Sequence, residues 1–401
     1  MGVYSVLKSL DSEGARRTGA SVPPSAWRPM VAVHLRSRVM RVLIVLSTDA
    51  RRGAEIEGQS LAAELSAAGV TTTVVALAAE AVGAVRLDVP VLGRTRLGVA
   101  TLRALRARAR DHDVVVAYGS STLQACALAL LGARTPFVYR SIGDPAEWVR
   151  GRRHAARTAW FMKRAARVVA LWDGAAQSIV EVYGLPAERV VVIPNARSHQ
   201  EFLPPTPDER RAARQRFGVV GAESLVVVVG ALSDEKRVDL AVHAVARVPD
   251  GKLLVVGDGP RRSSLESLGR AELGARVEFT GALHDVLPVY HAADVVLMTS
   301  RTEGMPGVLL EAGLVGAPVV ATDVGAVSWL VEHGVRGEVV PVDTDADGLA
   351  AAVLRVRTQV APPSGESSAA RLAGCRWDDV RPRWLDCLGP LGQARSGGRP
   401  P

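Results

Sequence analysis

The stretch EGMPGVLLEAGLVGAPVVATDVGA, residues 303–326, decides the fold class of this chain. Pro306 has the φ angle that is favoured in the first turn of a helix, and Gly316-Ala317-Pro318 predicts where that helix ends. The apolar run at 319–321 is typical of a parallel strand that is buried on both faces. A helix that leads directly into such a strand indicates an α/β unit.

The same helix would begin at an anion-binding end. A helix that starts near residue 306 points free N–H groups and the positive end of its dipole at the preceding loop, where a diphosphate would be stabilised. Glu303 lies in that loop, and Glu311 lies about one turn inside the helix, where a buried carboxylate needs partners such as ribose hydroxyls. Two glutamates at this spacing are also compatible with a solvated helix face, so the flanking sequence has to distinguish the two interpretations.

Buried strands alternate with helical patterns on both sides of this stretch. Such repeated βα units predict doubly wound parallel sheets. A proline-containing segment, residues 193–207, separates two series of units and is predicted to connect two domains. The predicted fold class is α/β, with two Rossmann-like domains facing a central cleft. The predicted strands are 41–47, 72–77, 114–118, 137–139, 168–171 and 190–193 in the first series, and 225–229, 252–256, 277–279 and 295–298 in the second.

The domain boundaries follow from these patterns. Residues 1–39 have no packing pattern and no apolar signal-peptide core, so we expect a disordered extension, with translation starting at Met40. Residues 40–203 form the predicted N-terminal domain, in which the first helix is expected from about Gln59. Residues 204–374 form the second domain. The last segment, 375–401, contains a terminal helical pattern at 375–388 that is expected to return to the first domain.

Several ordered segments, taken together with the two-glutamate stretch, are similar to one enzyme family. The chain resembles the retaining, GT-B-fold glycosyltransferases of family 4 over most of residues 40–390. The resemblance implies transfer of a sugar from a nucleotide-sugar donor to a glycan, lipid-linked or small-molecule acceptor, with retained anomeric configuration, in polysaccharide or glycoconjugate biosynthesis. The segments that carry it are VVVIPNA (190–196), GALSDEKRVDLAVHAVA (230–246), LLVVGDGPRRSSLESL and RVEFTGAL (within 253–283), and the stretch at 303–326.

The resemblance also implies site residues. Lys236 is the predicted catalytic cation for the leaving diphosphate, and Glu303 is predicted to orient the reacting sugar. Ala231 stands where the family carries an arginine, a change that Arg237 is expected to offset. The predicted donor-binding residues are Gly53, Arg237, Leu283, Gly304, Met305, Pro306, Gly307 and Glu311.

The acceptor side departs from the family pattern. Ile142 occupies the site where the family commonly carries a histidine, so Arg140 and Asp144 become the acceptor-side candidates. Two alternatives to transfer stay open. One is a sugar-nucleotide epimerase on the same scaffold, and the other is a noncatalytic relative that binds a nucleotide sugar or a glycan.

No metal or other cofactor is expected beyond the nucleotide sugar, which is a substrate. The DxD patterns at 111–113 and 343–347 precede a strand and a helix, where aspartates are natural caps, so they are interpreted as caps and not as metal ligands. Three cysteines match neither a disulfide framework nor metal-ligand spacing, which favours a reducing cytoplasm.

Composition and charge bound the partners. Of the 401 residues 48% are hydrophobic, and no apolar stretch reaches the roughly 18 residues that a membrane span needs. The net charge is +8, and the basic excess lies before residue 204. Arginines recur at 103, 106 and 110, and again from Arg150 to Arg167. They predict an anionic membrane surface or an anionic acceptor as partner, with peripheral attachment at the inner face of the cell membrane, or they merely solvate their helices; no nucleic-acid partner is expected.

Overall fold

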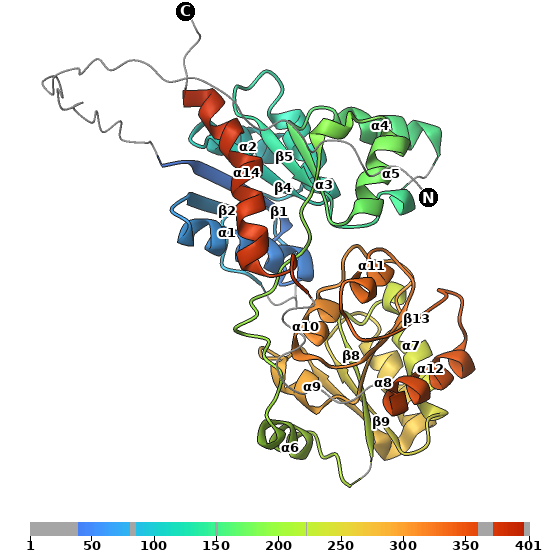
Figure 1. The fold of residues 1–401 in the computed structure, drawn as a ribbon. Coiled ribbons are helices and arrows are strands. Elements are labelled where there is room, and N and C mark those ends of the chain that lie inside the picture. The colour runs from blue at the N-terminus through green and yellow to red at the C-terminus, as the bar shows by residue number, and fades with distance from the viewer. Residues whose placement is uncertain (1–38, 81–85, 149–150, 222, 360–371, 397–401) are drawn as a thin grey trace, which may run out of the picture. The chain divides into compact units, whose positions relative to one another are not determined.

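The computed structural model describes residues 39–80, 86–148, 151–221, 223–359 and 372–396. The predicted disordered extension therefore lies almost wholly outside the described residues. Within these ranges the chain forms two parallel sheets, each covered by helices (Figure 1). This arrangement confirms the α/β class with two Rossmann-like domains. No helix among the described residues is both long and apolar enough to cross a membrane.

The first sheet has the strand order β3-β2-β1-β4-β5-β6-β7, and all its pairs are parallel. Its central strands are nearly continuous runs of buried valine, isoleucine and leucine, because helices cover both faces. The sequence did not predict β3, whose three residues are too few to show a pattern. The strands are β1 (Arg41–Thr48), β2 (Thr71–Ala78), β3 (Val91–Gly93), β4 (Val114–Tyr118), β5 (Phe137–Arg140), β6 (Arg167–Ala170) and β7 (Val190–Val192).

The helices of this part are α1 (Gly53–Ala67), α2 (Val99–Arg110), α3 (Ser120–Ala129), α4 (Arg152–Met162) and α5 (Asp173–Tyr183). The predicted start of α1 near Gln59 is wrong, because the helix begins six residues earlier at Gly53. Arg52 stands at its N-cap and makes no side-chain cap, and glycine is a poor helix former. The local sequence therefore contains no signal for the first turn of α1, which is stabilised by the packing of buried residues of the helix.

The second sheet has the order β10-β9-β8-β11-β12-β13 and is also parallel. The sequence missed β13, because Gly337 and Glu338 interrupt its apolar pattern. The strands are β8 (Ser224–Val229), β9 (Gly251–Val256), β10 (Val277–Gly281), β11 (Val295–Met298), β12 (Val319–Thr322) and β13 (Gly337–Val340). Helices are α6 (Pro207–Arg216), α7 (Val238–Ala246), α8 (Arg262–Leu273), α9 (Leu287–Ala292), α10 (Gly307–Val315), α11 (Val327–Glu332) and α12 (Ala346–Gln359).

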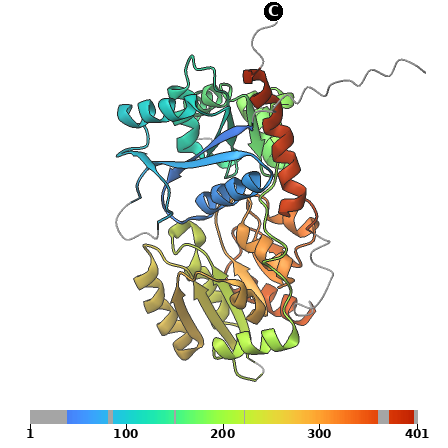
Figure 2. The same cartoon turned by 90° about the vertical axis from the view of Figure 1, so that its left-hand side faces the viewer.

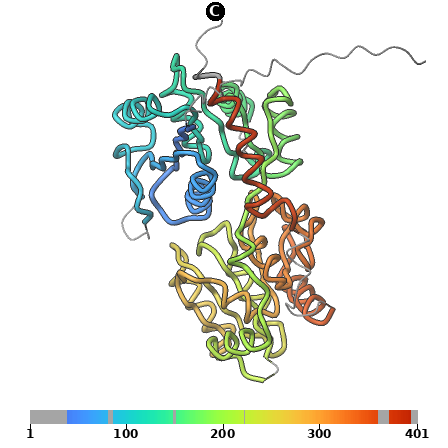
Figure 3. The backbone as a smooth tube through the Cα atoms, turned by 60° about the vertical axis from the view of Figure 1, so that its left-hand side comes forward, coloured from blue at the N-terminus to red at the C-terminus, as the bar shows by residue number. Residues whose placement is uncertain are grey.

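The last helix, α14 (Trp377–Ser396), packs on α1 and on the face of the first sheet (Figure 2). Its residues Val380, Trp384 and Leu388 join a buried cluster with Ile44 and other residues of that sheet. Trp384 is only 1% exposed. The chain thus leaves the first sheet after β7 and returns to it at its end, as the trace in Figure 3 shows. The helix is longer than the predicted 375–388, because Pro382 and Pro390 do not stop it.

Each sheet contains one point at which the strand order reverses, and this point positions the site. In the first sheet it lies between β1 and β4, and in the second between β8 and β11. In parallel sheets of this kind, ligands bind beyond the carboxyl ends of the strands at the reversal point. A ligand of the second sheet is therefore expected at the loops that follow β8 and β11.

Candidate active site

The loops after β8 and β11 bring together the two residues predicted to be catalytic. Lys236 Nζ lies 2.5 Å from Glu303 Oε1. Ser300 Oγ donates to the same oxygen at 2.7 Å. The two charged residues are 67 positions apart in the sequence. They meet because both follow neighbouring strands at the reversal point of the sheet.

The lysine is held by the backbone around it. Lys236 ends a short 3-10 turn, and Arg237 follows in the left-handed conformation at φ +47°. The hydroxyl of Thr299 donates to the carbonyl oxygens of both residues, at 2.9 and 2.8 Å. Arg237 Nε donates to Thr299 O at 2.7 Å, and Arg237 Nη2 donates to Val342 O at 2.7 Å. Arg237, expected to bind the donor, thus has two of its nitrogens committed to bracing this loop.

Helix α10 begins four residues after Glu303. Pro306 is its N-cap, with ψ 120°, so the helix starts at Gly307 and not at the proline as predicted. The main-chain N–H groups of Gly307 and Val308 have no hydrogen-bond partner among the described residues, as expected for the first turn of a helix. A free helix N-terminus next to a lysine is a favourable place for a diphosphate.

The glycines of this loop are required by close packing. Gly325 has φ +58°, and a Cβ there would lie 2.3 Å from Gly304 O and 2.5 Å from Glu303 O. A Cβ on Gly304 would lie 2.1 Å from Ile142 O. The main-chain N–H of Ala326 donates to Gly304 O at 2.8 Å. The loop that carries Glu303 is therefore fixed by the backbone that surrounds it.

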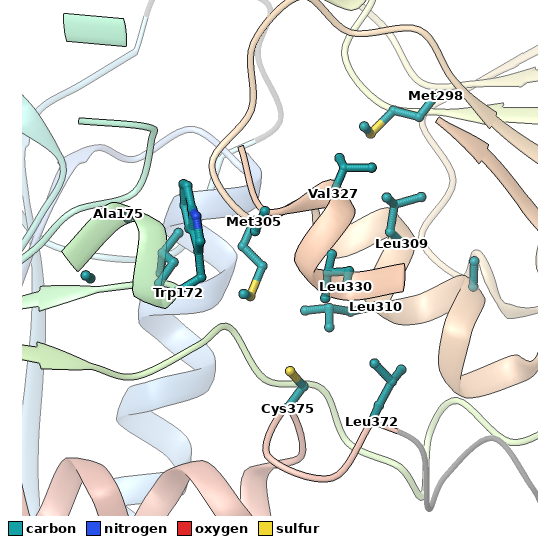
Figure 4. Close-up of a cluster of buried hydrophobic side chains, with 14 of the residues drawn as sticks. Trp172, Ala175, Met298, Met305, Leu309, Leu310, Val327, Leu330, Leu372 and Cys375 are labelled. Atoms are coloured by element: carbon teal, nitrogen blue, oxygen red, sulfur yellow. The ribbon is translucent and has the colours of Figure 1, made fainter. Parts of the chain in front are cut away.

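Met305 and Pro306 have buried side chains, so of Met305 only main-chain atoms remain for a donor. Met305 belongs to the buried cluster that contains Trp172 and Leu310 (Figure 4). Asn195 donates through Nδ2 to Met305 O at 2.8 Å. Any contact of Met305 with the donor would therefore come from its main chain, and the donor-binding role of both residues stays a prediction.

Glu311, the second glutamate, has two protein partners. Arg197 Nε donates to Oε1 at 2.8 Å, and Tyr290 Oη donates to Oε2 at 2.7 Å. Arg197 Nη1 also donates to Glu57 Oε2 at 2.5 Å. Burial lowers the pKa of Arg197, but Glu311 and Glu57 more than offset this and raise it above its ordinary value. Burial, together with the charge of Glu311, raises the pKa of Tyr290, so the hydroxyl stays protonated and donates.

Two other predicted donor residues are Leu283, just after a strand, and Gly53, at the start of a helix. Leu283 follows β10 and is half-buried against the hydrophobic core. Gly53 is exposed at the first position of α1, and nothing lies within 4 Å of the place where its Cβ would be. Neither makes a contact that assigns it to a ligand.

The prediction that Arg140 contacts the acceptor is wrong. Its side chain is 1% exposed, and its guanidinium donates to Ile193 O, Pro194 O and Asn195 Oδ1 at 3.1, 3.2 and 2.7 Å. It also lies over the Trp384 ring, 5.2 Å from the centroid. It therefore ties β5 to the segment after β7. Asp144 is half-buried and caps Ala146 N at 2.9 Å, so it stays a candidate for the acceptor side.

Two of the DxD aspartates accept hydrogen bonds from main-chain N–H groups. Asp113 accepts from Arg41 N at 2.8 Å, and Asp345 caps Gly348 N at 2.9 Å in the first turn of α12. Within the described ranges, no group of three or more His, Cys, Asp or Glu side chains is arranged to hold a metal ion. The three cysteines are buried thiols.

Sequence reasoning missed Arg197, Glu57 and Tyr290. Arg197 follows the short strand β7, Glu57 lies on α1, and Tyr290 lies on α9. No local pattern marks any of them, because the ion pairs join residues more than 100 positions apart. The one available signal was Tyr290, a residue with a polar hydroxyl in the mostly apolar helix α9.

Two family models match the chain. Residues 52–201 match the model described as Glycosyltransferase Family 4, and residues 223–359 match the one described as Glycosyl transferases group 1. The matched ranges contain the first and the second sheet respectively, apart from the first strand. Both models are therefore present in the order that the fold requires.

Curated relatives are similar to half of the chain. The alpha-D-kanosaminyltransferase of Streptomyces kanamyceticus is 34% identical over 212 residues, which is 51% of this chain and 53% of the relative. The 2-deoxystreptamine glucosyltransferase of the same organism is 35% identical over 53% of this chain and 56% of its own. A D-inositol 3-phosphate glycosyltransferase of Mycobacterium avium is 31% identical over 53% and 52%. The chain thus spans about half the length of these relatives.

Solved structures share the whole fold. HepE of Anabaena, in complex with UDP-glucose, has a TM-score of 0.75 at 22% identity and covers 88% of this chain and 100% of its own. The glycosyltransferase WaaG has a TM-score of 0.61 at 20% identity, with 88% and 98% covered. At these identities the likeness concerns the fold alone. Residues 52–201 therefore belong to a family 4 glycosyltransferase domain and residues 223–359 to a group 1 glycosyltransferase domain, within the GT-B fold that these structures share.

Proposed function

We propose that the protein transfers a sugar from a nucleotide-sugar donor to an acceptor hydroxyl, with retained anomeric configuration. The observation that carries this proposal is the Lys236–Glu303 pair, 2.5 Å apart, in the loops that precede the free N-terminus of α10 and follow β8. A cation and main-chain donors at one point can stabilise the charge that grows on a leaving diphosphate.

In the proposed reaction the acceptor oxygen bonds to the anomeric carbon, and the bond from that carbon to the diphosphate breaks. The proton of the acceptor hydroxyl leaves with the diphosphate. Lys236 binds the departing phosphate oxygens, and the N–H groups of Gly307 and Val308 donate to the same group. Glu303 turns to the hydroxyls of the sugar, and Glu311 holds the ribose of the nucleotide.

The names of the relatives favour a small-molecule acceptor within this proposal. One is named for 2-deoxystreptamine and another for D-inositol 3-phosphate. The neighbouring structure with UDP-glucose favours a UDP-sugar as the first donor to try. Asp144 is then the residue that we assign to the acceptor side, because the buried Arg140 cannot reach it.

A turnover screen tests the function. The protein is incubated with UDP-, GDP-, ADP- and dTDP-sugars, each with 2-deoxystreptamine, D-inositol 3-phosphate or no acceptor, and products are followed by mass spectrometry and NMR. We expect a glycosylated acceptor with the anomeric configuration of the donor. A changed donor without acceptor would identify an epimerase instead, and nucleotide binding without any product would identify a noncatalytic binding protein.

We expect turnover to persist without divalent metal, because Lys236 and main-chain N–H groups supply the positive charge for the diphosphate. The check is the transfer rate after dialysis against EDTA, compared with the rate after adding back Mg²⁺ or Mn²⁺. A rate that disappears with the chelator and returns with manganese would contradict this expectation.

Of the two arginine-rich stretches predicted for the anionic surface, we propose the one on α4. Arg106 is not free to bind lipid, because its Nη1 donates to Ala129 O and Leu131 O at 2.9 and 2.7 Å. On α4, Arg153 and Arg157 are exposed, and Trp160 is 47% exposed on the same side of the helix, with Arg164 5.5 Å over its ring. Arg150 lies outside the described residues. An exposed tryptophan among arginines suits the interface of an anionic membrane.

Cosedimentation with vesicles of phosphatidylcholine, with or without phosphatidylglycerol, checks this surface. We expect binding only with the anionic lipid, weakened by salt and by the double change Arg153→Ser and Arg157→Ser, since each basic residue contributes about 1 kcal/mol near such a surface. Arg211→Ser with Arg270→Ser is the matched control, because both side chains are well exposed elsewhere. If the protein bound neutral and anionic vesicles equally, the arginines of α4 would serve only to solvate the helix.

A further inference from the structure

A series of alternating arginines and glutamates holds the carboxylate of Glu311 in place. Arg197 lies between Glu311 and Glu57, donating to them at 2.8 and 2.5 Å. Glu57 Oε1 accepts from Ala196 N at 3.2 Å and lies 4.0 Å from Arg140 Nη2. Two arginines and two glutamates thus alternate from β5 and α1 to α10, and their charges balance.

The hydrogen bonds of Glu311 to the protein occupy only some of the acceptor sites of its carboxylate. An ionised carboxylate has about two acceptor sites on each oxygen. Arg197 occupies one site on Oε1, and Tyr290 occupies one on Oε2. One site on each oxygen has no hydrogen-bond partner among the described residues, and the side chain of Glu311 is 14% exposed. Two acceptors held side by side in one plane match two adjacent hydroxyl groups.

Gly307 adds a second constraint on the arginine. A Cβ on this residue would lie 2.1 Å from Arg197 Nη2, so the guanidinium is packed against the first turn of α10. It therefore cannot rotate away without losing its contacts with both glutamates. The plane of the Glu311 carboxylate is set by residues that do not themselves face the ligand.

We propose that Arg197, anchored by Glu57, is a positioning residue that presents Glu311 to a vicinal diol, so that the donor is a ribonucleotide and not a 2′-deoxyribonucleotide. The inference rests on the proposed function, in which Glu311 holds the ribose of the donor. A ribose offers two adjacent hydroxyls to the two free sites, whereas a deoxyribose leaves one of them unpaired. An unmade hydrogen bond to a buried charged group is costly, so the missing hydroxyl should lower affinity about tenfold or more.

The test compares matched pairs of nucleotides by calorimetry: UDP with 2′-dUDP, GDP with 2′-dGDP, and ADP with 2′-dADP. For the pair that binds most tightly, we expect the wild-type protein to prefer the ribonucleotide at least tenfold. Arg197→Met should reduce this preference to about threefold or less, because the hydrogen bond from Tyr290 alone does not fix the plane of the Glu311 carboxylate. Glu57→Gln should give an intermediate ratio.

The double variant Arg197→Met with Glu57→Gln should show the same ratio as Arg197→Met alone, because Glu57 acts only through the arginine. Arg355→Met is the control, since it removes an arginine paired with Glu338 outside the site. A mere loss of stability would weaken both members of a pair equally and leave their ratio unchanged. If Arg197→Met fails to fold, the ratio measured for Glu57→Gln decides the matter.

The outcomes separate this inference from the proposed function. No wild-type preference for the ribonucleotide, or a ratio that survives Arg197→Met and Glu57→Gln, would overturn the role of Arg197 while nucleotide binding stands. If the wild-type protein binds none of the six nucleotides, the proposed function itself fails.

Discussion

Replacing Lys236 by methionine is expected to lower kcat by about 100- to 1,000-fold, the usual effect of removing one preorganised charge from a developing anion. In the free protein its ammonium group lies 2.5 Å from Glu303 Oε1. In the proposed mechanism, the same ammonium group binds the leaving diphosphate when the donor is present. Methionine keeps the length of the side chain and removes the charge, so the effect falls on turnover more than on folding.

Steady-state kinetics with the best donor from the screen measure this effect, and Lys236→Arg should recover part of the rate because it restores the charge. Lys252→Met is the matched control. Lys252 also contacts a carboxylate, Glu278 at 3.9 Å, and bonds the carbonyl oxygens of Phe217 and Gly218 outside the site. The Lys252→Met protein should be less stable than the wild type and should keep its kcat. Equal losses of kcat in both lysine variants would remove Lys236 from the reaction.

Replacing Glu311 by alanine is expected to affect stability and donor binding together. The change leaves Arg197 and Tyr290 without their shared partner, and the loss of one member of a largely buried ion pair costs about 3 kcal/mol of unfolding free energy. It also removes the proposed acceptor for the ribose, so the affinity for free nucleotide should fall more than tenfold. Urea unfolding and calorimetry measure the two effects.

Two variants serve as comparisons for Glu311→Ala. Tyr290→Phe removes one hydrogen bond to the carboxylate and should cost about 1.5 kcal/mol while keeping most of the nucleotide affinity. Glu303→Ala should mainly lower kcat, because its carboxylate faces the reacting sugar in the proposed mechanism. If Glu303→Ala and Glu311→Ala weakened free-nucleotide binding equally, the division of roles between the two glutamates would be wrong.

Local sequence patterns predicted most of the helices and strands. Continuous apolar runs such as 114–118 predicted strands because parallel strands are buried on both faces, and the structure has β4 at those residues. Pro306, Gly307 and Gly316 marked the two ends of α10 to within one residue, because their backbone preferences are local. Weak local signals explain the misses at β3, at β13 and at the first turn of α1.

Which distant side chains contact one another could not be predicted from local sequence and follows from the tertiary structure. Lys236 and Glu303 were predicted separately, but their contact depends on the strand order that places β8 beside β11. Arg140 was predicted for the acceptor and is instead buried against the segment after β7. Arg197 carried no signal at all, because its role comes from two carboxylates more than 100 residues away along the chain. Local preferences fix elements, whereas ion pairs between distant residues depend on packing, which no short stretch of sequence contains.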